Sequence, residues 1–95
     1  MAALEAIVSQ VESLVAAQDW ASLAEIDDEV RRCVSEAVAE ADQLGQERVR
    51  EAIQRLEALY DQARQGSEEE RDEAAEALRS TNRTQKAARA YLDNQ

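Results

Sequence analysis

This 95-residue sequence contains no histidine, phenylalanine or proline, and it has only one cysteine and two glycines. Without histidine, the commonest general base and a leading metal ligand are both absent. The single cysteine, Cys33, has no partner for an internal disulfide, and its position on an apolar helix face is typical of a core residue. The sequence also lacks a glycine-rich phosphate-binding loop. We therefore expect neither an enzyme nor a protein that binds a cofactor or a metal.

Basic residues are also scarce, with 11 Lys and Arg against 21 Asp and Glu, which gives a formal net charge of -10. Such a surface disfavours nucleic acid, whose phosphates select Lys and Arg. No apolar run approaches the roughly 20 residues of a membrane span, and the N-terminus lacks the basic start of a signal peptide. We expect a cytoplasmic protein that does not insert into membranes and whose charged partners are basic.

Alanine is abundant, with 19 residues, and the apolar residues recur with helical periodicity. This pattern predicts an all-α fold, a small antiparallel bundle of three to four helices that forms a single domain over residues 1–95. Leu, Ile and Val supply only 18 residues, so we expect a marginal core that gains from a partner, a second copy in a homodimer included. The first helix is predicted from a one-sided stripe of Leu4, Ile7, Val8, Val11, Leu14 and Val15.

A second helix is predicted to begin after Asp19, whose side chain can accept hydrogen bonds from the first backbone N–H groups, and to end at Gly45. The chain either bends at Asp19 or runs on nearly continuously from the first helix. The apolar face follows a near-heptad spacing, and Trp20 is predicted to close one end of the bundle. The acidic run 27–29 is predicted to be a solvated face.

A third helix is predicted to end at Gly66, and a fourth to run from about residue 68 to about residue 92. Ser67 and Glu70 have the spacing of a capping box at the start of the fourth helix. Residues 77–92 hold four basic side chains and no acid.

The apolar face of this last helix is small and partly polar. We interpret it as a helix that docks weakly on the acidic face of the second helix, around residues 25–29, and that can detach; the alternative is an ordinary solvated basic stripe. The residues assigned to this regulatory helix are Arg79, Arg83, Lys86 and Tyr91.

Detachment of the last helix would uncover an apolar groove between the second and third helices. An amphipathic segment of another protein can bind in such a groove. The alternative is that the same residues are ordinary bundle core. The predicted groove residues are Val34, Val38, Ile53, Leu56 and Tyr60.

Two motifs lie near opposite ends of the chain. One is "AAQDWASLAEIDDEV" (residues 16–30), with an acidic residue, a tryptophan and a leucine three residues later; the other is "STNRTQKAARAYL" (residues 80–92), with a Gln-Lys pair followed by Ala-Tyr. Together they resemble the FliT-type family of flagellar export chaperones, and the resemblance spans nearly the whole chain. The matching residues are Asp19, Trp20, Leu23, Gln85, Lys86, Ala90 and Tyr91.

The resemblance implies a chaperone that binds the C-terminal region of the filament-cap protein, prevents its early assembly and delivers it to the flagellar export apparatus. It also implies that the last helix covers the partner groove. Some members of the family bind the export ATPase, and some inhibit the master activator of flagellar transcription. Two alternatives stay open: a structural helical adaptor that self-associates, and an anti-activator that keeps a transcription regulator from DNA.

Overall fold

In a computed structural model the chain is a bundle of helices about 40 Å long. The structure describes residues 1–70 and 75–94, and the side chains of these residues other than 67–70 and 75–77. The predicted all-α bundle is confirmed. The helices in the described ranges are α1 (Ala2–Ala16), α2 (Trp20–Glu25), α3 (Asp27–Ala39), α4 (Ala41–Leu44), α5 (Gln46–Glu70) and α6 (Ala75–Asp93).

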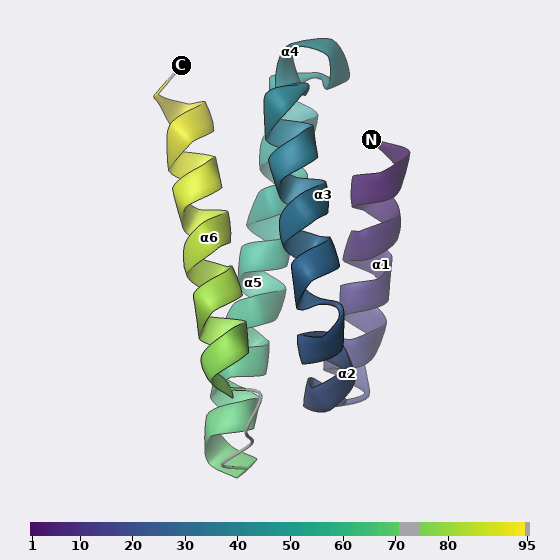
Figure 1. Cartoon of the computed structure of the whole chain (residues 1–95), viewed down its shortest axis with the longest axis vertical. Helices are drawn as coiled ribbons and strands as arrows, with labels where there is room; N and C mark the ends of the chain where they lie inside the picture. Colours follow the sequence, from purple (N-terminus) through teal and green to yellow (C-terminus); the bar gives the residue numbers. More distant parts are fainter. Residues whose placement is uncertain (71–74, 95) are drawn as a thin grey trace.

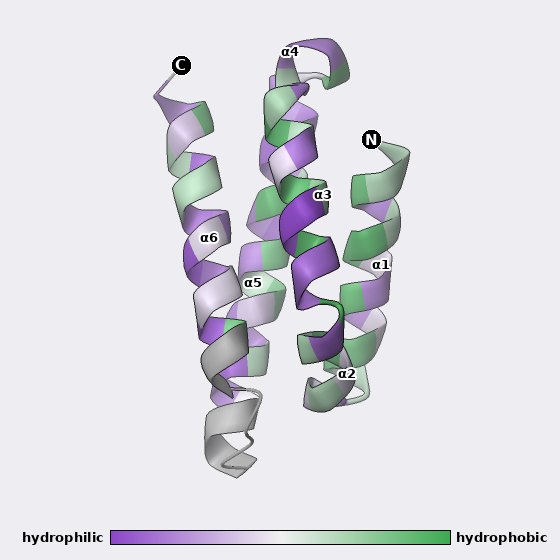
Figure 2. Cartoon of the chain, viewed as in Figure 1, coloured by the Kyte–Doolittle hydropathy of each residue, from purple (hydrophilic) through white to green (hydrophobic). Residues whose placement is uncertain are grey.

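The four longer helices lie side by side, and successive ones run in opposite directions (Figure 1). α5 packs against α1 and α6, and α6 packs against α3 as well. Figure 2 shows that hydrophobic residues are frequent on α1, whereas α3 presents hydrophilic residues on the side facing the viewer. No helix in the described part of the chain combines the length and apolar character needed to cross a bilayer.

α1 buries a narrow apolar stripe against the rest of the bundle. Its fully buried residues are spaced three or four apart, as expected for one face of a helix, whereas the predicted stripe members Val8 and Leu14 are only partly buried. Two ion pairs join α1 to α5 at the edge of this stripe: Arg48–Glu5 at 2.9 Å and Arg55–Glu12 at 3.3 Å. The buried α1 residues are Leu4, Ile7, Val11 and Val15.

The chain turns sharply between α1 and α2. Gln18 adopts a positive φ of 55°, which breaks the helical path. Asp19 then caps α2, because its carboxylate accepts a hydrogen bond from the Ser22 backbone N–H at 3.2 Å and from the Ser22 hydroxyl at 2.8 Å. The predicted cap is confirmed, and the chain bends there.

The second predicted helix is wrong as a single element, because the segment forms α2, α3 and α4. The backbone leaves helical geometry at Ile26 (ψ 4°) and again at Glu40 (ψ 14°). The prediction of its end is confirmed, since Gly45 terminates α4 with a φ of 98°, a region that side-chain-bearing residues rarely adopt.

The predicted boundary at Gly66 is also wrong. α5 continues through Gly66 to Glu70, so Ser67 does not start a new helix, and α6 begins at Ala75. The side chains of the predicted capping box, Ser67 and Glu70, lie outside the described ones. Gly66 serves a different purpose, because a Cβ at this position would lie 2.5 Å from Cζ2 of Trp20. Only a glycine allows the indole to pack this closely against α5.

Candidate functional site

The interface beneath α6 is polar in its centre. Leu78 and Leu92, which are 0% and 2% exposed, are the large aliphatic side chains that α6 buries in its described part. The positions between them that face the bundle carry polar side chains that are equally inaccessible to water. These buried polar residues are Thr81, Asn82 and Gln85.

Several of these buried polar atoms have no hydrogen-bond partner. Both side-chain amide atoms of Gln85 are unpaired, although the residue is 0% exposed. Oγ1 of Thr81 and Oδ1 of Asn82 are unpaired as well. A buried polar group without a partner costs about 1–3 kcal/mol, because it loses its hydrogen bonds to water on folding. The docking of α6 is therefore opposed by its own central residues.

Charged groups join α6 to α5 in an antiparallel register. Arg89 forms an ion pair with Glu57 at 3.2 Å, and Lys86 lies 3.8 Å from Asp61. Nδ2 of Asn82 donates to the same Asp61 at 2.6 Å. The predicted docking of the basic residues on 25–29 is thus wrong for Lys86 and Arg89, because they meet the carboxylates of α5. The other predicted residues of this helix differ in exposure: Arg79 is half-buried, whereas Arg83 and Tyr91 are exposed.

Asp27 is buried at the junction of α3, α5 and α6, only 3% exposed. Its Oδ2 accepts from Arg31 at 3.1 Å, and its Oδ1 accepts from the hydroxyl of Tyr60 at 3.4 Å. Thr81 faces the same carboxylate from α6, although its hydroxyl makes no hydrogen bond of standard geometry. The predicted solvated face is therefore wrong at Asp27, whereas Asp28 is exposed as expected.

Burial raises the pKa of the Asp27 carboxyl; Thr81, Arg31 and Tyr60 oppose this rise only in part. Burial also raises the pKa of the Tyr60 hydroxyl, and the neighbouring Asp27 carboxylate adds to this effect. Glu57, which is 7% exposed and has an unpaired Oε1, behaves like Asp27: burial raises its pKa more than Arg89 and Lys86 lower it. Two carboxyl groups whose charged form is disfavoured thus lie close to α6.

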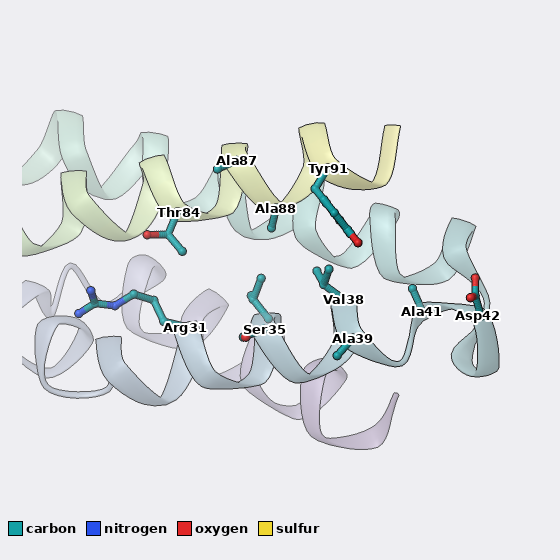
Figure 3. Close-up of a pocket in the computed structure, with 11 residues that line it drawn as sticks. Arg31, Ser35, Val38, Ala39, Ala41, Asp42, Thr84, Ala87, Ala88 and Tyr91 are labelled. Atoms are coloured by element: carbon teal, nitrogen blue, oxygen red, sulfur yellow. The ribbon is translucent and has the colours of Figure 1, made fainter. Parts of the chain in front are cut away.

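A groove of about 610 Å³ lies between α3 and α6. Figure 3 shows Val38 facing it from α3, and Ala88 and Tyr91 facing it from α6. Ser35 of α3 lines it as well. Tyr91 is 57% exposed and is the one large hydrophobic side chain classed as exposed among the described residues. Its walls are mainly small residues, and Ala41 and Asp42 of α4 line it as well.

The predicted groove residues divide between this open groove and the core. Val34 and Val38 line the groove, with Val34 buried and Val38 partly buried. The other three, Ile53, Leu56 and Tyr60, are each 0% exposed on α5. In this structure the five residues therefore do not form one open surface.

The described residues include one cysteine and many carboxylates, side-chain types that can hold a metal ion. Cys33 is buried on α3, and burial raises the pKa of its thiol, which disfavours the reactive thiolate. No group of three or more Cys, Asp and Glu side chains in the described ranges is arranged to hold a metal ion. The features that distinguish the molecule are the contacts of α6.

Sequence reasoning missed the buried carboxylates beneath α6. For Asp27 a signal exists, because 23, 27, 30 and 34 follow the four-three-four spacing of a buried helix face, so the aspartate stands at a core position. Glu57 also has a signal, since it stands four residues after the buried Ile53 and three before the buried Tyr60, on the same helix face. Which buried side chains are left unpaired depends on the register between α5 and α6.

Known proteins give no direct guidance to the function. No family model matches the chain, and no curated protein or solved structure matches it significantly. Function is therefore inferred from the two sequence motifs and from the packing of α6.

Proposed function

We propose that this protein is a flagellar export chaperone. It binds the C-terminal region of the filament-cap protein, keeps it from assembling early and delivers it to the export apparatus, with α6 as a removable cover over the binding surface. The observation that carries this proposal is the unpaired, fully buried Gln85 at the centre of the α6 interface. The motifs around Trp20 and Tyr91 supply the choice of partner.

The contrast between α6 and α1 supports the role of a cover. Four aliphatic side chains hold α1 in the core, and fully burying each one contributes about 1.5–3 kcal/mol. The described part of α6 buries Leu78 and Leu92 in the same way, while its unpaired polar groups each cost about 1–3 kcal/mol. Because the unpaired polar groups offset much of the aliphatic gain, α6 is easier for a partner to displace than α1.

The geometry of the open groove also fits this role. Val34 and Val38 form part of one wall, and α6 forms the other. Movement of α6 away from α3 would therefore widen an existing groove and uncover more of the apolar surface. An amphipathic helix of the filament-cap protein would then bind along α3 and α5. The export ATPase and the master activator of flagellar transcription are proposed as secondary partners.

The test compares full-length variants by calorimetric titration with the C-terminal segment of the filament-cap protein. Leu78→Asp places a charge at a 0% exposed position of α6 and should undock this helix, whereas Ala90→Asp adds the same charge at an exposed position of the same helix. We expect Leu78→Asp to bind several-fold more tightly than wild type and Ala90→Asp to bind as wild type does. A tenfold gain would correspond to about 1.4 kcal/mol of closure.

Circular dichroism checks that both variants keep their helical content. If Leu78→Asp unfolds completely and the wild-type chain does not bind the segment, α6 is part of the essential core and the chaperone mechanism is wrong. The structural adaptor that self-associates would then be the better explanation, and sedimentation would detect the dimer.

A further inference from the structure

The residues that α6 places against α5 indicate what kind of helix can replace it. From the C-terminal toward the N-terminal end of α5, Asp61 contacts Asn82 and Lys86, and Glu57 contacts Arg89. Arg50, nearer the N-terminal end, pairs with Asp93 at 2.8 Å. This order is that of two antiparallel helices in register. α6 therefore presents two cations, three residues apart, to two carboxylates four residues apart on α5.

Undocking of α6 removes these cations from the carboxylates. The cationic groups that lower the pKa of Glu57 are Arg89 and Lys86, both on α6. The nitrogen atoms within reach of Asp61 in the described contacts also belong to α6, from Asn82 and Lys86. Asp27, which Thr81 covers from α6, keeps Arg31 of its own helix. The uncovered surface is thus an apolar strip edged by carboxylates that have lost their counter-charges.

We infer that the partner segment accepted at this surface is a basic amphipathic helix that reproduces the charge pattern of α6. Its pattern is two Lys or Arg residues three positions apart, followed three positions later by an aliphatic residue, as in Lys86, Arg89 and Leu92. The helix lies antiparallel to α5. This inference rests on the proposed function, since it describes the occupant of the surface that α6 is proposed to release.

An acidic or neutral helix would leave Glu57 and Asp61 without counter-charges at a partly desolvated surface. The side chain of Glu57 is only 10% exposed beside Arg89, so solvent screens it less than a fully exposed pair. The net charge of -10 adds a long-range attraction for basic segments. Both effects select against partners that lack the two cations.

The test uses synthetic peptides with the sequence of residues 75–93 and the full-length Leu78→Asp chain, whose own α6 is expected to be undocked. The parent peptide carries Lys86 and Arg89. A matched control moves these two cations to the exposed positions 87 and 90 by the exchanges Lys86→Ala, Ala87→Lys, Arg89→Ala and Ala90→Arg, so that composition and net charge stay the same. Binding is followed by fluorescence anisotropy at low and at high salt.

We expect the control peptide to bind about tenfold more weakly than the parent, in the range that close charge pairs contribute at interfaces. The parent should lose affinity as salt rises and also when the chain carries Glu57→Gln and Asp61→Asn. If both peptides bind equally well, the inferred requirement for two cations is wrong, whereas the proposed binding of a helix at this surface remains supported. If the Leu78→Asp chain keeps its helical content and binds neither peptide, both this inference and the proposed function are wrong.

The wild-type chain provides a second measurement if Leu78→Asp does not fold. Its own α6 competes with the peptide, so only the order of the two affinities is compared. Stronger binding of the parent peptide supports the inference. Equal binding of the two peptides overturns it. So does the absence of binding at about millimolar peptide, because the tethered α6 competes at an effective concentration of that order, which such a peptide concentration matches.

Discussion

The indole of Trp20 occupies the space in which a side chain at position 66 would have to lie. A Cβ built on Gly66 would be 2.5 Å from Cζ2 and 3.2 Å from Cε2 of the ring. Because Trp20 is 4% exposed and packed into the bundle, the ring has little room to withdraw. This contact joins the short helix α2 to the C-terminal part of α5.

Gly66→Ala should destabilise the protein by about 1–3 kcal/mol, the usual cost of forcing extra atoms into a packed site. Helix propensity alone predicts the opposite, since alanine is favoured over glycine inside a helix by about 1 kcal/mol. Urea denaturation followed by circular dichroism measures the difference.

The double variant Trp20→Leu with Gly66→Ala serves as the control. With the large ring removed, the alanine should no longer cost stability relative to Trp20→Leu alone. A Gly66→Ala single variant that is more stable than wild type would show that the ring moves aside freely.

Gln85→Leu should stabilise the protein by about 1–3 kcal/mol. The substitution replaces two unpaired polar atoms at a 0% exposed position by apolar groups of similar size. The gain should appear in the free energy of unfolding from urea titration. Affinity for the partner segment should fall at the same time, because a more tightly docked α6 is harder to displace. A loss of stability in this variant would mean that Gln85 is paired in solution, for example by water.

The stability of the protein should depend on pH through Asp27. Because burial raises the pKa of this carboxyl above the value of 3.8 for an ordinary aspartate, the folded chain binds this proton more tightly than the unfolded chain. The contribution of Asp27 to the free energy of unfolding therefore falls as pH rises from about 3.8 through the raised pKa, and it stays low above that pKa. Glu57 contributes with the same sign, from its ordinary value of 4.5 upward.

Asp27→Asn isolates this effect, since the amide has the same shape but does not titrate. Urea denaturation across this acidic range and up to neutral pH should show a smaller fall in stability with rising pH for Asp27→Asn than for wild type. Identical slopes for wild type and Asp27→Asn would contradict the raised pKa.

Cys33 should react slowly with thiol reagents in the folded protein. It is 7% exposed, and burial raises the pKa of its thiol, so both access and the thiolate fraction are reduced. We expect the rate of modification by a disulfide reagent at neutral pH to be at least about 100-fold below that of the urea-unfolded chain, since local or global opening must precede reaction. Rapid modification in native buffer would disprove the tight packing of α3.

The sequence predicted the elements that depend on local signals. The stripe of α1 follows from the helical spacing of its apolar residues, and the cap at Asp19 and the helix end at Gly45 each follow from one residue type at one position. Gly66 was misread, because a glycine that ends a helix and a glycine that admits a distant tryptophan look the same in a sequence. The difference lies in a contact between residues 46 positions apart.

The partners of the basic residues of α6 could not be predicted for the same reason. Acidic side chains are present on both α3 and α5, so charge alone does not predict which of the two helices pairs with the basic residues of α6. The choice is made by the register that buries Leu78 and Leu92, which brings Arg89 to Glu57. The weak apolar face of the last helix was visible in the sequence, but its unpaired Gln85 became visible only once that register was known.

The unequal attachment of α1 and α6 has a consequence for how the protein tolerates mutation. Substitutions at Leu4 or Val11 remove aliphatic packing from the core and should lower the amount of folded protein in a cell. If α6 is the proposed removable cover, substitutions at Gln85 or Lys86 should change partner affinity while abundance stays near normal. A deep mutational scan that records abundance and binding separately should show substitutions in α1 lowering mainly abundance and substitutions in α6 changing mainly binding.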